Sequence, residues 1–255
     1  MSMIQQLRAQ AQAAAQKATI DMSQASTGGG GERRVFPAGY AFAQLVEVVE
    51  FGKHPQEFGG KAKDPALEFR LGFAIWGGDP ANPYNREDGT PNIIRTWDIK
   101  LSNTEKAKAK IAFDKLNYKG TAKSFPELLG EKYLIKIDVK ASKADATKKF
   151  NDIDLKGTLP PFDPVSRQPY AIPEAPDDAY RLFLWSLPTK EGWDSLFIEG
   201  SREDGTSKNY LQEKCLAALD FPGSALEQML RGSGAAIPSP EELAAQAPVP
   251  ATPPT

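Results

Sequence analysis

The stretch "HPQEFGGKAKDPALEFRLGFAIW", residues 54–76, decides the fold because its two halves follow different patterns. In the second half, every odd position from Leu67 to Ile75 is apolar, as in a strand with one buried face. The first half is a polar loop with two lysines and the pair Gly59-Gly60. A basic, glycine-containing loop joined to so regular a strand predicts the nucleic-acid-facing edge of a small β-barrel.

Further segments with strand or helix patterns follow on both sides of this stretch. They predict strands at 40–51, 67–76 and 93–101, a helix at 104–116, and strands at 133–139 and 150–155. Three strands, a helix and two strands is the order of an OB-fold, a five-stranded barrel. A plain antiparallel sheet with one helix remains the alternative. The buried side of the helix is predicted to carry Ala107, Ile111 and Leu116.

The composition of the remaining sequence divides the chain into four parts. An Ala/Gln-rich segment with a glycine linker and a Pro/Ala-rich tail are expected to be mobile. A proline-rich wrap, extra strands and a helix are expected to pack on the barrel. The boundaries are 1–31 for the N-terminal segment, 32–158 for the OB-fold core, 159–230 for the wrap, strands and helix, and 231–255 for the tail. Within the third part, 181–188 and 193–200 suggest a strand pair or a short apolar ribbon, and 207–221 a helix.

The overall composition is that of an ordinary soluble globular protein, with 255 residues, 40% hydrophobic and 25% charged. No apolar run approaches the roughly 20 residues that span a bilayer, and we expect no secretory signal and no membrane partner. The single cysteine, Cys215, excludes an internal disulfide and fits a reducing compartment. One histidine and one cysteine argue against zinc, and we expect no metal or other cofactor.

The charge of the chain is unevenly distributed. Residues 33–150 contain 21 Lys and Arg against 15 Asp and Glu, whereas residues 151–255 contain 8 against 16. A basic middle followed by an acidic remainder suggests a module that binds a polyanion, joined to a segment of opposite net charge. Two differently solvated surfaces would give the same numbers.

The residues expected to bind nucleic acid form three groups. Lysines can neutralise phosphates, and exposed aromatic rings can stack on bases. The groups are Lys53, Phe58, Lys61 and Lys63 in the opening loop, Arg70 and Trp76 on the outward face of the second strand, and Lys136, Lys140, Lys143, Lys148 and Lys149 along the fourth strand and its following loop. A solvated loop, a tryptophan that caps the barrel and a solvated lysine face are the alternatives.

Parity assigns the two tryptophans of the sheet to different environments. Trp76 lies opposite in parity to the apolar positions of its strand and is predicted to be exposed beside Arg70. Trp97 shares parity with Ile99 and is predicted to lie in the core, although Arg95 has the same parity.

The sequence contains no arrangement typical of a catalytic site. His54 has no distinctive Ser or Cys partner. The acidic pairs 177–178 and 203–204 are explained by turn chemistry, and no glycine-rich phosphate loop followed by Lys and Ser or Thr is present. We therefore expect a binding protein and not an enzyme.

Two separated segments carry a further pattern. The matching residues are Glu50, Gly52, His54, Glu57, Phe58, Gly60 and Lys61, and then Trp193, Ser195, Phe197, Ile198, Gly200, Asp204, Gly205, Ser207, Lys208, Asn209, Leu211 and Gln212. The chain in this respect resembles, over roughly 36–225, a group of tailed-phage proteins assigned as single-stranded DNA-binding proteins of OB-fold type.

The resemblance implies binding of single-stranded DNA in phage replication or recombination, with other phage proteins as possible partners, in the cytoplasm of an infected bacterial host. The chain departs from many such binders at its end, which reads "APVPATPPT" and is neither acidic nor tipped by an aromatic residue. Recruitment of partners by the tail is therefore in doubt. A non-enzymatic phage structural or adaptor protein that binds another protein is the alternative function.

Overall fold

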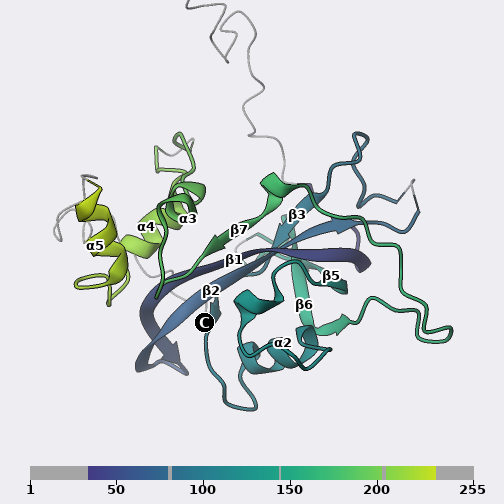
Figure 1. Ribbon diagram of the computed structural model, residues 1–255, viewed down its shortest axis with the longest axis horizontal. Helices are drawn as coiled ribbons and strands as arrows, with labels where there is room; N and C mark the ends of the chain where they lie inside the picture. The colour runs from purple at the N-terminus through teal and green to yellow at the C-terminus, as the bar shows by residue number, and fades with distance from the viewer. Residues whose placement is uncertain (1–33, 80–81, 144, 203–204, 234–255) are drawn as a thin grey trace, which may run out of the picture. The chain divides into compact units, whose positions relative to one another are not determined.

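An antiparallel ribbon of two long strands, β1 (Gly39–Phe58) and β2 (Lys61–Trp76), forms the centre of the fold (Figure 1). It belongs to a computed structural model that describes residues 34–79, 82–143, 145–202 and 205–233. Gly59 and Gly60 alone join the strands, with φ angles of +59° and +72° as in a type I′ turn. The prediction of a long polar loop is therefore wrong, because a diglycine turn allows strand pairing to continue to the tip.

Five further strands complete a seven-stranded sheet (Figure 1). They are β3 (Asn92–Arg95), β4 (Ile99–Lys100), β5 (Lys132–Ala141), β6 (Lys149–Leu159) and β7 (Arg181–Phe183). The main strand order is β3-β2-β1-β5-β6, β4 pairs with β2, and β7 pairs with β1. Only the β7 pairing is parallel among the described strands.

The sheet is open, since no pairing joins β3 or β4 to β6 in the described parts of the chain. The prediction of a mainly β protein with some helices is confirmed. The strand predicted at 93–101 is interrupted at 96–98, which divides it into β3 and β4.

In the order of the chain, helix α2 (Lys108–Leu116) lies between β4 and β5, as predicted. It begins four residues later than expected. Its phase also differs from the prediction, because Ala107 and Ile111 are only half-buried. The residues that it buries against the sheet are Ala109, Ala112 and Leu116. A 3₁₀ turn, η1 (Phe125–Leu128), follows and buries Phe125 and Leu128 in the same core.

The alternation of β2 predicts its inward face correctly. Phe69, Leu71, Phe73 and Ile75 are at most 2% exposed and pack with residues of β1, β5, β6 and α2. Leu67 is only half-buried, because it lies where this core meets a second cluster. Burial of each large apolar side chain contributes about 1.5–3 kcal/mol, so this face is a main source of the stability of the sheet.

The C-terminal part packs on β1 through a second apolar cluster. It contains η2 (Asp177–Ala179), β7, α3 (Lys190–Ser195), α4 (Tyr210–Leu216) and α5 (Ala225–Gly232). Phe51 of β1 packs there with Phe183, Trp185 and Leu211. The helix predicted near 207–221 is present as α4, whereas 193–200 forms the end of α3 and an irregular segment instead of the predicted strand.

Most of the predicted mobile ends, 1–31 and 231–255, lies outside the described residues. Within the part of the chain that the structure describes, no helix combines the length and the apolar character needed to cross a bilayer.

Candidate nucleic-acid interface

The outward face of β2 is covered by the proline-rich segment at 170–180. Trp76 is only 5% exposed and packs in a cluster with Val46 and Ala74 beneath Ile172 and Ala175. The prediction that Trp76 offers an open stacking surface is therefore wrong. Parity placed the side chain on the correct face, but the segment at 170–180 adds a second layer over that face.

A buried carboxylate on this face links β3 and β7 to β1. Glu47 is 2% exposed at its side chain and accepts hydrogen bonds from Arg95 Nε at 2.9 Å and Arg181 Nη1 at 3.2 Å. Gly72 leaves the space for it, because a Cβ there would meet the Cβ of Glu47 at 2.6 Å. The two guanidinium groups balance a charge that would be costly to bury alone.

Arg70, predicted as the cation of the stacking platform, is occupied by contacts within the chain. Its Nε donates to Asp98 Oδ1 at 2.8 Å and its Nη1 donates to the Tyr210 hydroxyl at 3.0 Å. Lys214 of α4 bridges Asp98 and Glu68 at 2.5 and 2.6 Å. These contacts fasten α4 to the edge of β2, so Arg70 serves docking of this helix and is not free for a phosphate.

The two lysines predicted on the fourth strand have acidic partners on the neighbouring strand. Lys136 Nζ lies 3.0 Å from Asp154 Oδ2, and Lys140 forms an ion pair with Asp152. The hydrogen bond that each lysine donates to its aspartate raises the pKa of the lysine. Both aspartates belong to β6, and the register of β5 and β6 places Asp154 directly opposite Lys136 and Asp152 diagonally across from Lys140.

Trp97 is a second tryptophan whose exposure the sequence analysis predicted wrongly. It is 54% exposed, and its ring meets the Phe150 ring edge-on with 5.5 Å between centroids. Ile94 and Thr96 are the buried residues of this segment, so Trp97 shares the outward parity of Arg95. The charged side chain at position 95 was the signal in the sequence that could have corrected the register.

The Trp97–Phe150 pair spans the open seam of the sheet. Thr96 is held beside β2, because its backbone N–H donates to the Leu71 carbonyl and its hydroxyl accepts from the Leu71 N–H. Phe150 belongs to β6 at the other end of the strand order. A ring from the link between β3 and β4 and a ring from β6 thus meet at this seam.

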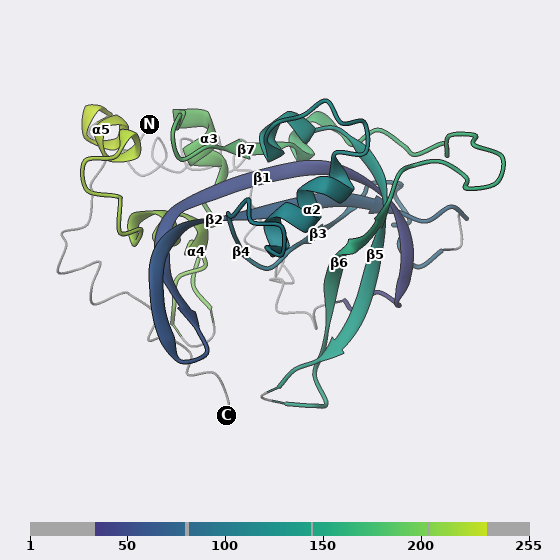
Figure 2. The same ribbon diagram turned by 90° about the horizontal axis from the view of Figure 1, so that it is seen from below.

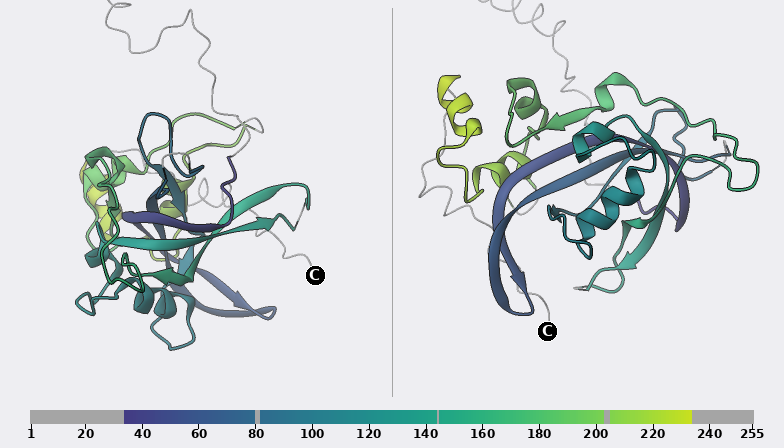
Figure 3. Two further views of the ribbon diagram at one scale, coloured as in Figure 1. Left: turned by 90° about the vertical axis from the view of Figure 1, so that its right-hand side faces the viewer. Right: turned by 60° about the horizontal axis from the view of Figure 1, so that its bottom comes forward.

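Two hairpins project toward the same side of the sheet, with β4 lying between them (Figure 2). We call the outer part of the β1–β2 ribbon, residues 52–67, the β1–β2 arm. The views of Figure 3 show the arm and the β5–β6 hairpin extending in a common direction. The exposed lysines of this region are Lys53, Lys61 and Lys63 on the arm, Lys100 on β4, and Lys143, Lys148 and Lys149 at the end of the β5–β6 hairpin.

Phe58 lies at the tip of the arm and is 79% exposed. It pairs with Lys61, whereas Arg70 and Trp76 lie nine and fifteen residues further along β2. Nine residues already correspond to roughly 30 Å of strand. Phe58, Arg70 and Trp76 are therefore not brought together as the sequence analysis expected.

No cluster of three or more His, Cys, Asp or Glu residues suited to a metal ion occurs among the described residues. The ring Nε2 of His54 lies 3.1 Å from the Phe51 carbonyl oxygen, and burial lowers the pKa of the imidazole. Burial raises the pKa of the Cys215 thiol, which lies in the second apolar cluster. Both side chains therefore have structural surroundings.

Comparison of the chain with protein-family models, with curated proteins and with solved structures finds no match.

Proposed function

We propose that this protein binds single-stranded DNA with little sequence preference, on an OB-type barrel with an open seam. It would act in phage DNA replication or recombination in the cytoplasm of an infected bacterium, as the sequence resemblance implies. The observation that carries the proposal is the exposed Trp97–Phe150 pair with basic hairpins on either side. Aromatic rings give contacts with any base, and lysines follow the phosphate backbone.

The strand order supports the OB-type part of the proposal. An OB-fold is a partly open five-stranded Greek-key barrel that binds oligonucleotides between the loop joining its first two strands and the loop joining its last two. Here β1, β2 and the β3–β4 segment precede α2, and β5 and β6 follow it, with β5 paired to β1. The β1–β2 arm and the β5–β6 hairpin correspond to those two loops. Trp97 and Phe150 lie at the open seam between the β3–β4 segment and β6.

The adaptor alternative is less favoured by the contacts of the proline-rich segment. Ile172 and Ala175 of that segment pack on the chain's own sheet and are not open to another protein. Gln44 fixes the same segment, because its side-chain oxygen accepts the Ala175 N–H at 2.8 Å.

We expect Trp97→Ala to weaken binding of a labelled oligo-dT by about 1–3 kcal/mol, the range for loss of one stacked base. The unfolding free energy should change little, because the ring is 54% exposed. Fluorescence anisotropy at fixed salt measures the affinity. Phe197→Ala is the matched control, since Phe197 is 57% exposed and lies beyond α3. Equal affinities for the two variants, or equal affinity of the native protein for duplex and single strand, would refute the proposal.

The salt dependence separates free lysines from paired ones. Lys149→Ala should make the log–log slope of affinity against salt shallower by about 0.7, the value for one phosphate contact on a single strand. Lys136→Ala should change it less, because Lys136 is already paired with Asp154. A titration of oligo-dT at four salt concentrations measures both slopes. A larger change for Lys136→Ala than for Lys149→Ala would assign the phosphate contacts to the face of β5 and β6 instead.

A further inference from the structure

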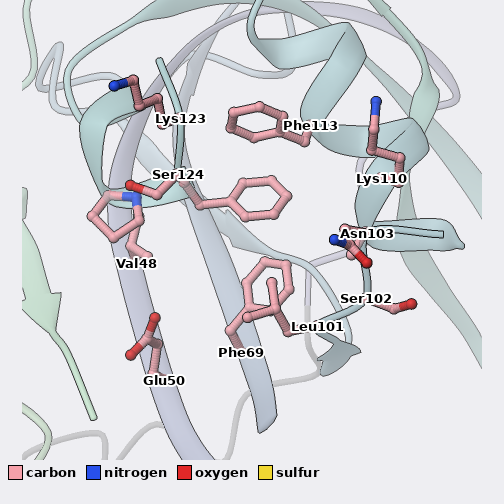
Figure 4. A pocket seen from close by; sticks show the side chains of 13 residues that line it. Val48, Glu50, Phe69, Leu101, Ser102, Asn103, Lys110, Phe113, Lys123 and Ser124 are labelled. Carbon is pink, nitrogen blue, oxygen red and sulfur yellow. The ribbon is translucent and has the colours of Figure 1, made fainter. Parts of the chain in front are cut away.

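An aromatic pocket opens between the sheet and α2 at the base of the β1–β2 arm (Figure 4). Its volume is about 450 Å³, within the range of sites that hold a compact ligand or a partner's side chain. Phe69, Phe113 and Phe125 form its wall, with ring centroids 4.6 Å apart for Phe69 and Phe125 and 5.3 Å apart for Phe113 and Phe125. Leu101 borders it and is 44% exposed.

Charged groups stand on opposite sides of these rings. Figure 4 shows Lys110 and Lys123 flanking Phe113 at one end of the pocket and Glu50 at the other end. Lys110 already forms an ion pair with Asp114 at 2.6 Å, so Lys123 is the lysine that an acidic group would meet here. The Glu50 carboxylate accepts one hydrogen bond, from the Trp185 N–H at 2.8 Å. The pocket therefore suits an apolar side chain that has an acidic neighbour to face the lysine end and a basic neighbour to face Glu50.

The tip of the arm has this combination of groups. Phe58 is 79% exposed and is flanked by Glu57 in β1 and by Lys61, its pairing partner in β2. The two positive φ angles at Gly59 and Gly60 fix the turn that presents the ring. A single large apolar side chain on a pre-ordered tip is typical of an anchor residue that enters a partner's pocket.

The arm cannot fill the pocket of its own chain. Glu50 and Phe69 form one pair of the β1–β2 ladder and line the pocket, whereas Phe58 lies eight residues further along β1. Eight residues correspond to roughly 26 Å of strand, and the ladder between them keeps tip and pocket apart. A Phe58 side chain that enters this pocket must therefore come from another copy of the chain.

We propose that two copies of this chain exchange the tips of their β1–β2 arms, so that Phe58 of each copy enters the aromatic pocket of the other. Tip and pocket lie at opposite ends of one ribbon, so two antiparallel arms satisfy both contacts at once in a closed two-fold dimer. Glu57 then faces Lys123 of the other copy, and Lys61 faces its Glu50. The proposal does not depend on DNA binding.

The first test is the mass of the full-length chain in solution without DNA, by sedimentation equilibrium across the micromolar range. The native chain should form a dimer of twice 27.8 kDa. Phe58→Ser should raise the dissociation constant about 30-fold or more, as for loss of an interface anchor. Leu187→Ala, at a site 70% exposed beyond β7, is the control and should leave it unchanged. A monomer for the native chain at all concentrations, or an unchanged constant for Phe58→Ser, would overturn the proposal.

Mixing two defective variants tests the exchange itself. Phe58→Ser lacks the tip, and Leu101→Arg blocks the mouth of the pocket, so neither should dimerise alone. Their mixture should associate, because the intact tip of the second variant can enter the intact pocket of the first. Anisotropy of labelled Phe58→Ser protein, titrated with unlabelled Leu101→Arg protein, measures this. A native dimer without association of the mixture would show that the copies meet elsewhere.

A third test exchanges charges at exposed positions, so that its result does not depend on correct folding of Leu101→Arg. Glu57→Lys should weaken the dimer, and Lys123→Glu in the same chain should restore it, because the pair is then reversed in sign. Loss without restoration would refute the assigned contact. If instead Phe58→Ser lowers the affinity for oligo-dT and leaves the mass unchanged, the tip belongs to the DNA interface and the exchange is wrong.

Discussion

Trp76→Ala is expected to lower the free energy of unfolding by about 3–5 kcal/mol, the usual cost of truncating a buried tryptophan. The side chain is 5% exposed and packs between the sheet and the segment at 170–180. Its removal leaves a cavity under Ile172 and Ala175 and loosens the contact of that segment with β2. Urea unfolding followed by far-UV circular dichroism measures the change.

The folded fraction of Trp76→Ala should bind oligo-dT as the native protein does, which is the opposite of the expectation for Trp97→Ala. Comparison of the two variants thus distinguishes a tryptophan of the core, Trp76, from a tryptophan of the interface, Trp97. If Trp76→Ala kept its stability and lost affinity, the segment at 170–180 would have to leave the sheet for DNA to bind, and the candidate interface would move to the outward face of β2.

The sequence predicted best those parts of the fold in which one face of a strand is buried. Phe69, Leu71, Phe73 and Ile75 alternate with residues of the other face, and a period of two is compatible with a strand but not with a helix. The same argument located β5 from Tyr133, Ile135 and Ile137, which are fully buried. Local sequence decides these features, so no knowledge of the neighbours was required.

The candidate site was harder to predict because its features depend on contacts between distant segments. Trp76 is buried by residues about 100 positions further along the chain, and Lys136 is paired by the register of β5 with β6. Trp97 is exposed because the strand expected at 93–101 is interrupted, which changes parity between Thr96 and Ile99. Parity gives the face of a sheet on which a side chain lies, but not what covers that face.

The structural role of Gly52 could not be predicted from the sequence either. It lies at an irregularity of β1 between Glu50 and Lys53 and has a φ angle of +81°. A Cβ at this position would lie 2.6 Å from the Cβ of Ala218 and 2.7 Å from the Trp185 ring. The C-terminal segment therefore approaches the base of the β1–β2 arm so closely that only glycine fits.

Backbone contacts fix this approach from both sides. The Leu219 N–H donates to the Lys53 carbonyl at 2.8 Å, and the Lys53 N–H donates to Asp220 Oδ1 at 2.7 Å. The other carboxylate oxygen of Asp220 accepts the Trp185 Nε1–H at 3.1 Å. With both chain segments held in this way, neither can easily move to make room for a methyl group.

Gly52→Ala should therefore destabilise the fold by about 2–5 kcal/mol, which combines the strain of a left-handed backbone with overpacking. Gly60→Ala is the matched control, because Gly60 also has a positive φ angle, +72°, but no atom lies within 4 Å of its added Cβ. It should cost only the backbone part, about 1–2 kcal/mol. Urea unfolding of both variants measures the difference.

A second change isolates the steric part of the Gly52 effect. Ala218→Gly in the Gly52→Ala background removes the nearest atom and should recover part of the lost stability, while the contact with Trp185 and the backbone strain remain. Equal losses of unfolding free energy for Gly52→Ala and Gly60→Ala, with no recovery in the double variant, would contradict this. They would show that the C-terminal segment moves to accommodate the added methyl group. The close approach would then not be what requires glycine at position 52, and the arm base would be free to move independently of α4.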